Sequence, residues 1–293
     1  MTGQLTVSVI VCTRERPQLL HDTIESILAG ETKPTEIIIV DQSGRADPEL
    51  EHHAEEGLRY LWTRGRGLTR ARNLGITSAR GQIVAFSDDD VRVHTGWLSA
   101  LVDAIGEEDE RRVAAGQVIP GSPERPGAFT TSSYVDSVPA TYTGRIERDP
   151  LGGGNMAMYR SGFDLVGLFD ERLGPGTRYP AAEDNDLGLR LLEAGFCIVY
   201  APEAIVYHRA WRSRWWYPLV RWRYGRGKGG FYGKHLGLSD RHIQRRLARD
   251  VGHRARRLPR NMLRQPRQAV GDLAYLAGLA TALMQWLVKE RRG

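Results

Sequence analysis

Apolar and polar positions follow two patterns along the first two thirds of the chain, and each pattern predicts a different element. Apolar runs of strand length, typical of buried parallel strands, occupy residues 7–12, 36–41 and 82–91. Between them, apolar residues recur every three or four positions after Pro17, up to a stop at Gly30, and again over residues 67–79. This order of strand, helix and strand predicts a βαβ unit and an α/β fold.

The later segments continue the pattern less regularly. Further strands are expected at residues 59–62, 113–119, 155–159, 197–201 and 204–208. Further helices are expected around Trp97 to Ile105 and around Leu187 to Leu192, the second ending near Gly195. Residues 120–150 are rich in Gly, Pro, Ser and Thr and show no periodicity, which predicts a long connection of the kind that is usually functional or mobile.

Three consecutive carboxylates, Asp88, Asp89 and Asp90, lie in the run at residues 82–91. Ligands of open α/β sheets bind at the carboxyl ends of the strands. Carboxylates there can hold Mg²⁺ or Mn²⁺ through one or two oxygens and leave the other positions to phosphates. Asp is also common where a strand ends and a helix is capped. The triplet alone therefore leaves a metal site and a structural turn both open.

Charge divides the 293-residue chain into two parts. Residues 1–208 carry 20 Lys and Arg against 31 acids, whereas residues 209–293 carry 21 against 4. We therefore expect a first domain at 1–208 and a basic, mainly helical extension at 209–293 that meets an anionic partner. The two cysteines, Cys12 and Cys197, lie in apolar runs and predict a reduced, cytosolic protein. The apolar run at residues 7–12 is too short for a signal peptide.

Seven motifs in this order resemble those of the family-2 inverting glycosyltransferases of the GT-A fold, over about residues 7 to 208. That resemblance implies a Rossmann-like, mostly parallel central sheet and a nucleoside-diphosphate sugar as donor. The motifs are VIVCTR (9–14), IIIVD (37–41), RARNLG (70–75), FSDDD (86–90), GGGN (152–155), EDNDL (183–187) and His208.

The resemblance also implies the residues of the donor site. Asp41 would accept the ring N–H of uracil or thymine, which favours a UDP- or dTDP-sugar, although an Asp here could instead open a turn. Arg72 is favoured over Arg70 for the diphosphate, because residues two apart lie on different sides of a helix. Glycines would allow close backbone approach to the ligand, or form a flexible turn. The full set is Thr13, Arg14, Asp41, Arg72, Asp88, Asp89, Gly153 and Gly154.

The resemblance also implies which residues bind the metal ion and which residue acts as general base. Asp90 and His208 would hold Mn²⁺ or Mg²⁺, and imidazole suits Mn²⁺ better; a lone His at a strand end can equally be structural. Asp184 would be the general base, with Glu183 as acceptor-binding residue or alternative base, although acids at this position also cap a helix. We expect Asp186 to be structural or to contact the acceptor. Attack opposite the leaving diphosphate predicts inversion.

The C-terminal region suggests where the protein works. Trp, Tyr and Arg alternate over residues 211–217 and 221–231, as membrane interfaces favour. The apolar stretch at 273–288 is shorter than the roughly 20 residues of a span, so we expect a helix lying in the interface or packed on a partner subunit. We therefore expect peripheral contact with an anionic membrane on the cytoplasmic face of the plasma membrane, with a glycan or lipid-linked acceptor; a homo-oligomer is also possible.

Two other functions fit parts of the sequence. A sugar-phosphate nucleotidyltransferase shares the fold type, but it needs a Gly-rich signature with a Lys after the first strand, and residues 12–16 do not supply one. A non-catalytic protein that binds an anionic surface or RNA would explain only the basic C-terminal region. Stacking on single-stranded nucleic acid is disfavoured, because no RNA-binding signature accompanies the aromatic residues.

Overall fold

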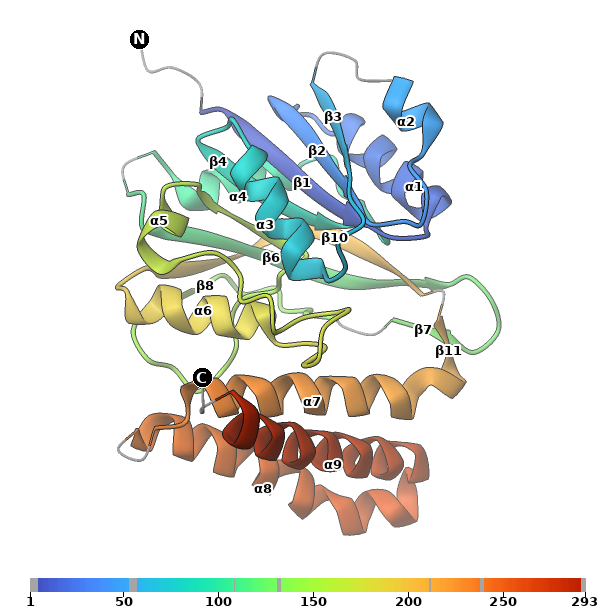
Figure 1. Ribbon diagram of the computed structural model, residues 1–293, viewed down its shortest axis with the longest axis vertical. Coiled ribbons are helices and arrows are strands. Elements are labelled where there is room, and N and C mark those ends of the chain that lie inside the picture. Colours follow the sequence, from blue (N-terminus) through green and yellow to red (C-terminus); the bar gives the residue numbers. More distant parts are fainter. Residues whose placement is uncertain are drawn as a thin grey trace.

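The computed structural model describes residues 5–52, 57–107, 109–130, 133–210, 212–237 and 240–290, so that Trp211 of the predicted aromatic segment lies outside the described residues. A β-sheet flanked by helices occupies one part of the molecule, and the long helices that end the described chain form the other (Figure 1). The sheet has nine strands in the order β3-β2-β1-β4-β9-β6-β10-β5, with β8 paired to β10. They are β1 (Val7–Thr13), β2 (Glu36–Asp41), β3 (Leu58–Trp62), β4 (Ile83–Asp88), β5 (Val91–Val93), β6 (Arg112–Pro123), β8 (Ala140–Tyr142), β9 (Asn155–Tyr159) and β10 (Cys197–Ala210).

The first four strands of the sheet order are parallel, as the βαβ pattern predicts. Strand β9 then runs antiparallel to both β4 and β6, and β10 runs parallel to β6. A separate two-stranded sheet pairs β7 (Ala128–Phe129) with β11 (Arg212–Ser213). The helices of this part are α1 (Pro17–Leu28), α2 (Pro48–His52), α3 (Leu68–Ser78), α4 (Trp97–Ile105), α5 (Gly162–Val166) and α6 (Glu183–Glu193).

Apolar residues cover both faces of the sheet, which explains why its strands read as continuous apolar runs. Alternate residues of β1 point to opposite faces: Val9 joins the cluster under α1 and α4, and Ile10 joins the one under α3, α5 and α6. The α/β class is therefore confirmed.

Three predicted elements differ from those observed. The run at 82–91 divides into β4 and β5, because Asp89 and Asp90 turn the chain before Val91 pairs antiparallel with β10 at His208. Residues 197–208 form one strand, with a register shift between Ala201 and Ile205, instead of two. The predicted connection at 120–150 begins with the end of β6 and contains β7 and β8.

The C-terminal region is helical, as predicted, and consists of η1 (Arg214–Trp216), α7 (Tyr217–His235), α8 (Arg241–Arg264) and α9 (Pro266–Lys289). Helix α7 lies between the sheet part and α9 (Figure 1). Gly225, Gly229 and Gly233 recur every four residues on α7, and a Cβ at any of them would lie under 3.0 Å from α9. The absence of side chains there lets the two backbones approach closely.

On its other side, α7 packs against the segment that precedes α6. Gly227 contacts Ala181, and Gly230 contacts Tyr179. Tyr179 and Leu173 share a buried cluster with Ala282 and Trp286 of α9. The C-terminal helices thus support the loop that leads into α6.

Candidate active site

The carboxyl ends of β1, β2 and β4 meet at one edge of the sheet. Thr13 is the register partner of Asp41, and Cys12 is the register partner of Asp88. Asp89 and Asp90 follow directly in the turn after β4. The topology therefore gathers the predicted donor residues of three strands at one place, where ligands of parallel sheets bind.

Asp89 is buried and held by the end of β1. Its Oδ2 accepts a hydrogen bond of 2.7 Å from the hydroxyl of Thr13, and its Oδ1 lies 2.8 Å from Nη1 of Arg16. Burial raises the pKa of Asp89 to about 6, an effect that the Arg16 guanidinium opposes and the Asp90 charge reinforces. The Thr13 hydroxyl thus orients a carboxylate of the triplet.

Asp90 and His208 face one another, and both are buried. Nε2 of His208 lies 3.6 Å from Oδ1 of Asp90, and Nδ1 lies 3.2 Å from the carbonyl oxygen of Arg209. A proton on Nδ1 would be donated to that carbonyl and would leave the Nε2 lone pair facing the carboxylate. Two facing acceptors need a cation or a proton between them. The pair therefore fits a divalent metal ion.

Cationic side chains surround the other oxygen of Asp90. Oδ2 lies 3.4 Å from Nη1 of Arg16 and 3.3 Å from Nη2 of Arg212. Neither arginine was predicted. Arg16 was missed because the sequence pattern drew attention to Arg14, which is exposed. Arg212 was missed because it lies far along the chain, beyond β10. The charge of the triplet is thus balanced in part by residues from outside the recognised motifs.

Arg72 lies under the site as a buried bridge between two carboxylates. Its Nη2 is 3.1 Å from Oδ1 of Asp88, and its Nη1 is 3.2 Å from Oε1 of Glu183. Arg70 points outward and pairs with Glu171 at 2.9 Å, so the two arginines do lie on different sides of α3. Arg72 thereby ties the end of β4 to the start of α6.

The glycines before β9 have a steric role. A Cβ at Gly153 would lie 2.6 Å from Nη1 of Arg72, and one at Gly154 would collide with the carboxylate of Asp88. Only glycine fits where the backbone passes this closely over side chains. The two glycines therefore let the Arg72 and Asp88 side chains lie directly against the loop.

Glu183 and Asp184 occupy the first turn of α6. Glu183 is buried, and burial raises its pKa to about 7; the Asp184 charge adds to the rise and Arg72 opposes it. Asp184 is half-buried and accepts hydrogen bonds from the N–H groups of Asn185 at 2.8 Å and Gly153 at 3.4 Å. Burial also raises the pKa of Asp184; Arg72 opposes this rise and Asp149 adds to it. Raised carboxyl pKa values are typical of groups that exchange protons near neutral pH.

Asp186, in the same turn, has its side chain fully buried among cations. Its Oδ1 is 2.7 Å from Nε2 of His235 and 2.7 Å from Nζ of Lys234, and its Oδ2 is 3.0 Å from Arg190. Although burial opposes it, the bond from His235 and the charges of Arg190 and Lys234 hold the pKa of Asp186 below its usual value. Asp186 therefore anchors α6 to α7.

Asp41 and Arg14 differ in how closely they join this network. Asp41 is buried at the end of β2, where Oδ2 accepts a 2.7 Å hydrogen bond from the hydroxyl of Tyr60 and Oδ1 a 2.8 Å bond from the N–H of Ser43. Each carboxylate oxygen keeps a further lone pair. Arg14 is exposed beside Glu15, whose positive φ of 56° marks a tight turn after β1.

Comparison with known proteins adds a family and several relatives. The model of glycosyl transferase family 2 matches residues 8–163. The glucosyl-dolichyl phosphate glucuronosyltransferase of Haloferax volcanii is 28% identical over an alignment of 229 residues, and the match covers 71% of this chain and 70% of the relative. The family match at residues 8–163 includes the acidic triplet and Gly153–Gly154.

Two solved structures have the same fold. The mannosyltransferase PcManGT from Pyrobaculum calidifontis, in complex with GDP-Man and Mn²⁺, superposes with a TM-score of 0.64 at 17% identity, covering 97% of this chain and 88% of that one. GalNAc-T7 with UDP, GalNAc and Mn²⁺ gives a TM-score of 0.57 at 19% identity over 85% of this chain. This chain spans only 55% of GalNAc-T7. The likeness confirms the predicted fold.

Proposed function

Since the chain belongs to glycosyl transferase family 2, we propose that it moves a sugar from a nucleoside-diphosphate sugar to a hydroxyl acceptor with inversion at the anomeric carbon. The observation that carries this proposal is the placement of Asp184 in the first turn of α6. Asp184 accepts a hydrogen bond from Gly153, and its neighbour Glu183 pairs with Arg72, which also pairs with Asp88 at the end of β4. The candidate base is thus the sequence neighbour of a carboxylate that Arg72 links to the candidate donor site.

We assign the proton transfer to Asp184 instead of Glu183. Glu183 is buried and its Oε1 is occupied by Arg72, whereas Asp184 is half-buried. A general base must come within hydrogen-bond reach of the acceptor hydroxyl. Glu183 then keeps Arg72 in place, and the negative charge of Asp149 helps to raise the proton affinity of Asp184.

Asp90 and His208 would hold a divalent cation, Mn²⁺ or Mg²⁺, as their facing acceptor atoms suggest. The two solved neighbours contain Mn²⁺ together with a nucleotide or nucleotide sugar, which supports the same use here. Such an ion, when bound, neutralises charge on the leaving diphosphate. Arg16 and Arg212, both close to Asp90, supply further positive charge at the same place.

For the donor we propose a UDP- or dTDP-sugar, with Asp41 accepting the ring N–H. For the acceptor we propose a cell-envelope or lipid-linked glycan, met at the cytoplasmic face of the plasma membrane. The excess of 21 basic over 4 acidic residues at 209–293 supports a membrane location. The relative from Haloferax volcanii, whose name includes a dolichyl phosphate, supports a lipid-linked acceptor.

A donor screen tests the proposal. The full-length protein is incubated with Mn²⁺ and with UDP-, dTDP- and GDP-sugars in turn, and the nucleoside diphosphate released is measured by mass spectrometry. We expect release from a uracil or thymine donor and its loss on chelation with EDTA. Equal release in EDTA would contradict the metal assignment, and release from GDP-sugars alone would contradict the role of Asp41.

A further inference from the structure

Helix α8 presents a long row of arginines to solvent. The exposed members are Arg241, Arg245, Arg249, Arg256, Arg257, Arg260 and Arg264, and Arg267 continues the row at the start of α9. Arg249 pairs with Glu147, but among the residues that the structure describes Arg256, Arg260 and Arg264 form no ion pair. Arg256, Arg260 and Arg264 are therefore positive charge that no ion pair of the described residues neutralises.

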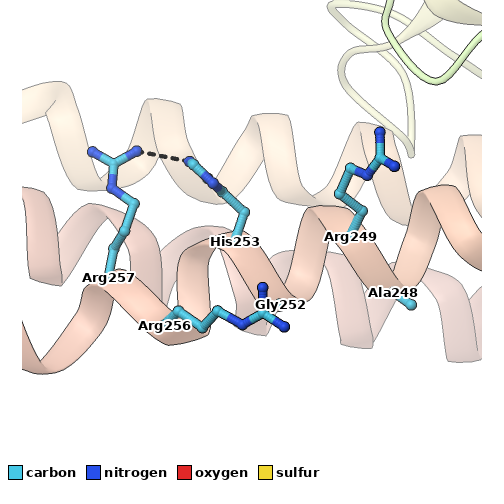
Figure 2. A pocket seen from close by; sticks show the side chains of 6 residues that line it. All are labelled: Ala248, Arg249, Gly252, His253, Arg256 and Arg257. Atoms are coloured by element: carbon cyan, nitrogen blue, oxygen red, sulfur yellow. Dashed lines mark hydrogen bonds between the residues drawn. The ribbon is translucent and has the colours of Figure 1, made fainter.

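Part of this row surrounds two hollows on the surface of α8. The larger, of about 440 Å³, is lined by Ala248, Arg249, Gly252, His253, Arg256 and Arg257. Figure 2 shows Arg257 and His253 pointing toward one another, and the Arg256 side chain extending along the helix toward Gly252. Nη1 of Arg257 lies 2.9 Å from Nε2 of His253. Arg257 also lines the second hollow, of about 220 Å³, with Arg260 and Arg264. Guanidinium groups around a hollow are suited to phosphate.

Helix α9, which packs against α8, presents an apolar row of its own (Figure 1). Its buried face, which includes Tyr275, Leu279 and Trp286, packs inside the protein. Between its two polar ends, its exposed residues are apolar except for one threonine: Val270, Leu273, Ala277, Ala280, Thr281, Met284 and Val288. This spacing places them in one stripe along the helix.

The two rows meet where α8 ends and α9 begins. Met262 and Leu263 are exposed there, Leu263 to 88%, between Arg260 and Arg264. The start of α9 packs on the start of α7, with Gly271 against Tyr217. The preceding Trp215, exposed to 80%, therefore lies toward the same end of the helical layer. Large apolar and aromatic side chains among arginines are typical of membrane interfaces.

We propose that the exposed rows of α8 and α9 form a docking surface for an anionic phospholipid bilayer. The arginines would contact lipid phosphates, and the stripe of α9 together with Met262 and Leu263 would enter the boundary of the acyl chains. Nucleic acid offers phosphates but no partner for aliphatic side chains, since its bases stack on aromatic ones. The apolar stripe therefore favours lipid over RNA.

This surface lies on helices that stay packed in the fold. By length and apolar composition α9 could also cross a membrane, which is weak evidence for a span because packed helices pass the same test. To span, α9 would have to leave the glycine row of α7 and withdraw Trp286 from Tyr179. A helix that lies along the bilayer surface keeps both contacts.

The test measures cosedimentation of the full-length protein with phosphatidylcholine vesicles, with and without phosphatidylglycerol. The triple variant R256Q/R260Q/R264Q is compared with R80Q/R111Q/R125Q, which removes the same charge from exposed arginines elsewhere that form no ion pair in the described part of the chain. At roughly five-fold per arginine, the α8 variant should lose on the order of 100-fold in binding to anionic vesicles. The matched variant should bind nearly as the parent does.

The apolar row is tested in the same assay at high salt, where the electrostatic part weakens. L273Q/M284Q should lose the salt-resistant binding, whereas V138Q/L165Q, which changes two exposed apolar residues outside the C-terminal helices, should keep it. Equal losses in test and matched variants would overturn the proposal. So would loss of poly-U RNA binding by the α8 variant while its vesicle binding is unchanged.

The proposal deepens the membrane location given above, but its test is independent of sugar transfer. Vesicle binding needs neither donor nor metal, so its failure leaves the transfer reaction standing. Conversely, inactivity in the donor screen leaves the docking surface standing. All substitutions are at exposed positions, where changes of unfolding free energy are usually within about 0.5 kcal/mol, and circular dichroism checks that each variant is folded.

Discussion

Nε2 of His235, at the end of α7, lies 2.7 Å from Oδ1 of Asp186, in the first turn of α6. An ionised carboxylate only accepts, so Nε2 carries the proton of this bond. The two residues are 49 positions apart in sequence, and Asp186 is two residues from the proposed base. The C-terminal helices are thus fastened directly to the turn that carries Asp184.

Replacing His235 by Leu should therefore lower kcat more than it changes donor KM. The turn of α6 would be held less firmly, and a misplacement of about 1 Å can cost up to about 100-fold in rate. His235→Gln, which retains an N–H donor, should recover part of the loss. Steady-state kinetics for the three proteins check this, and a Gln variant no better than the Leu variant would show that the hydrogen bond is not the cause.

Arg72 and Arg70 provide a matched pair for stability. Arg72→Met should lower the free energy of unfolding by about 3–5 kcal/mol, because it leaves the buried Glu183 without its cation. Arg70→Met breaks only an exposed pair and should cost about 0–1 kcal/mol. Urea titrations measure both values. Similar costs at the two positions would contradict the bridging role of Arg72.

Glycines of the C-terminal helices should respond to Ala in opposite ways. Gly229→Ala would place a methyl group against the backbone of α9 and should destabilise the protein by about 1–3 kcal/mol. Gly252→Ala, on α8 with no heavy atom within 4 Å of its new methyl group, should stabilise it by about 0.5–1 kcal/mol. The melting temperatures of both variants distinguish the close contact of α7 with α9 at Gly229 from the open surroundings of Gly252.

The raised pKa of Glu183 predicts how stability depends on pH. The folded carboxyl, with its pKa of about 7, binds its proton more tightly than the ordinary value of 4.5 allows. This residue therefore favours folding at low pH, and that contribution is lost as pH rises from 4.5 toward 7. Glu183→Gln should become relatively more stable than the parent across this window. Urea titrations at several pH values measure the unfolding free energy of each variant relative to the parent, with the exposed Glu171→Gln as control. If this difference changed equally with pH for both variants, the prediction would be wrong.

The sequence predicted most of the sheet, because buried parallel strands such as β1 and β2 must be apolar on both faces. It placed Asp88, Asp89 and Asp90 correctly at a strand end for the same reason. Long-range partners were not predictable: nothing near Asp186 in sequence indicates His235, and Arg16 could not be chosen over Arg14 before the turn at Glu15 was known. Periodicity describes which face a residue occupies, whereas ion pairs depend on tertiary packing.

The apolar stretch at 273–288 also underestimated the length of the C-terminal helix, and the reason is physical. Residues 273–288 are the continuous apolar part, but α9 begins at Pro266 and runs to Lys289. Its first turns are polar in sequence and are held by packing, such as that of Gly271 on Tyr217. A partner for this helix exists within the chain, namely α7.

The central claim is that Asp184 removes the acceptor proton while Asp90 and its neighbours serve the donor. The most direct test compares donor affinity and transfer rate in Asp184→Asn with Mn²⁺ present, using titration calorimetry for binding and product formation for transfer. Asn preserves shape but cannot take a proton, so donor affinity should be unchanged while the rate falls by about 10² to 10⁴, the usual contribution of a general base. A transfer rate close to that of the parent would contradict the account and move the base to Glu183 or Asp186.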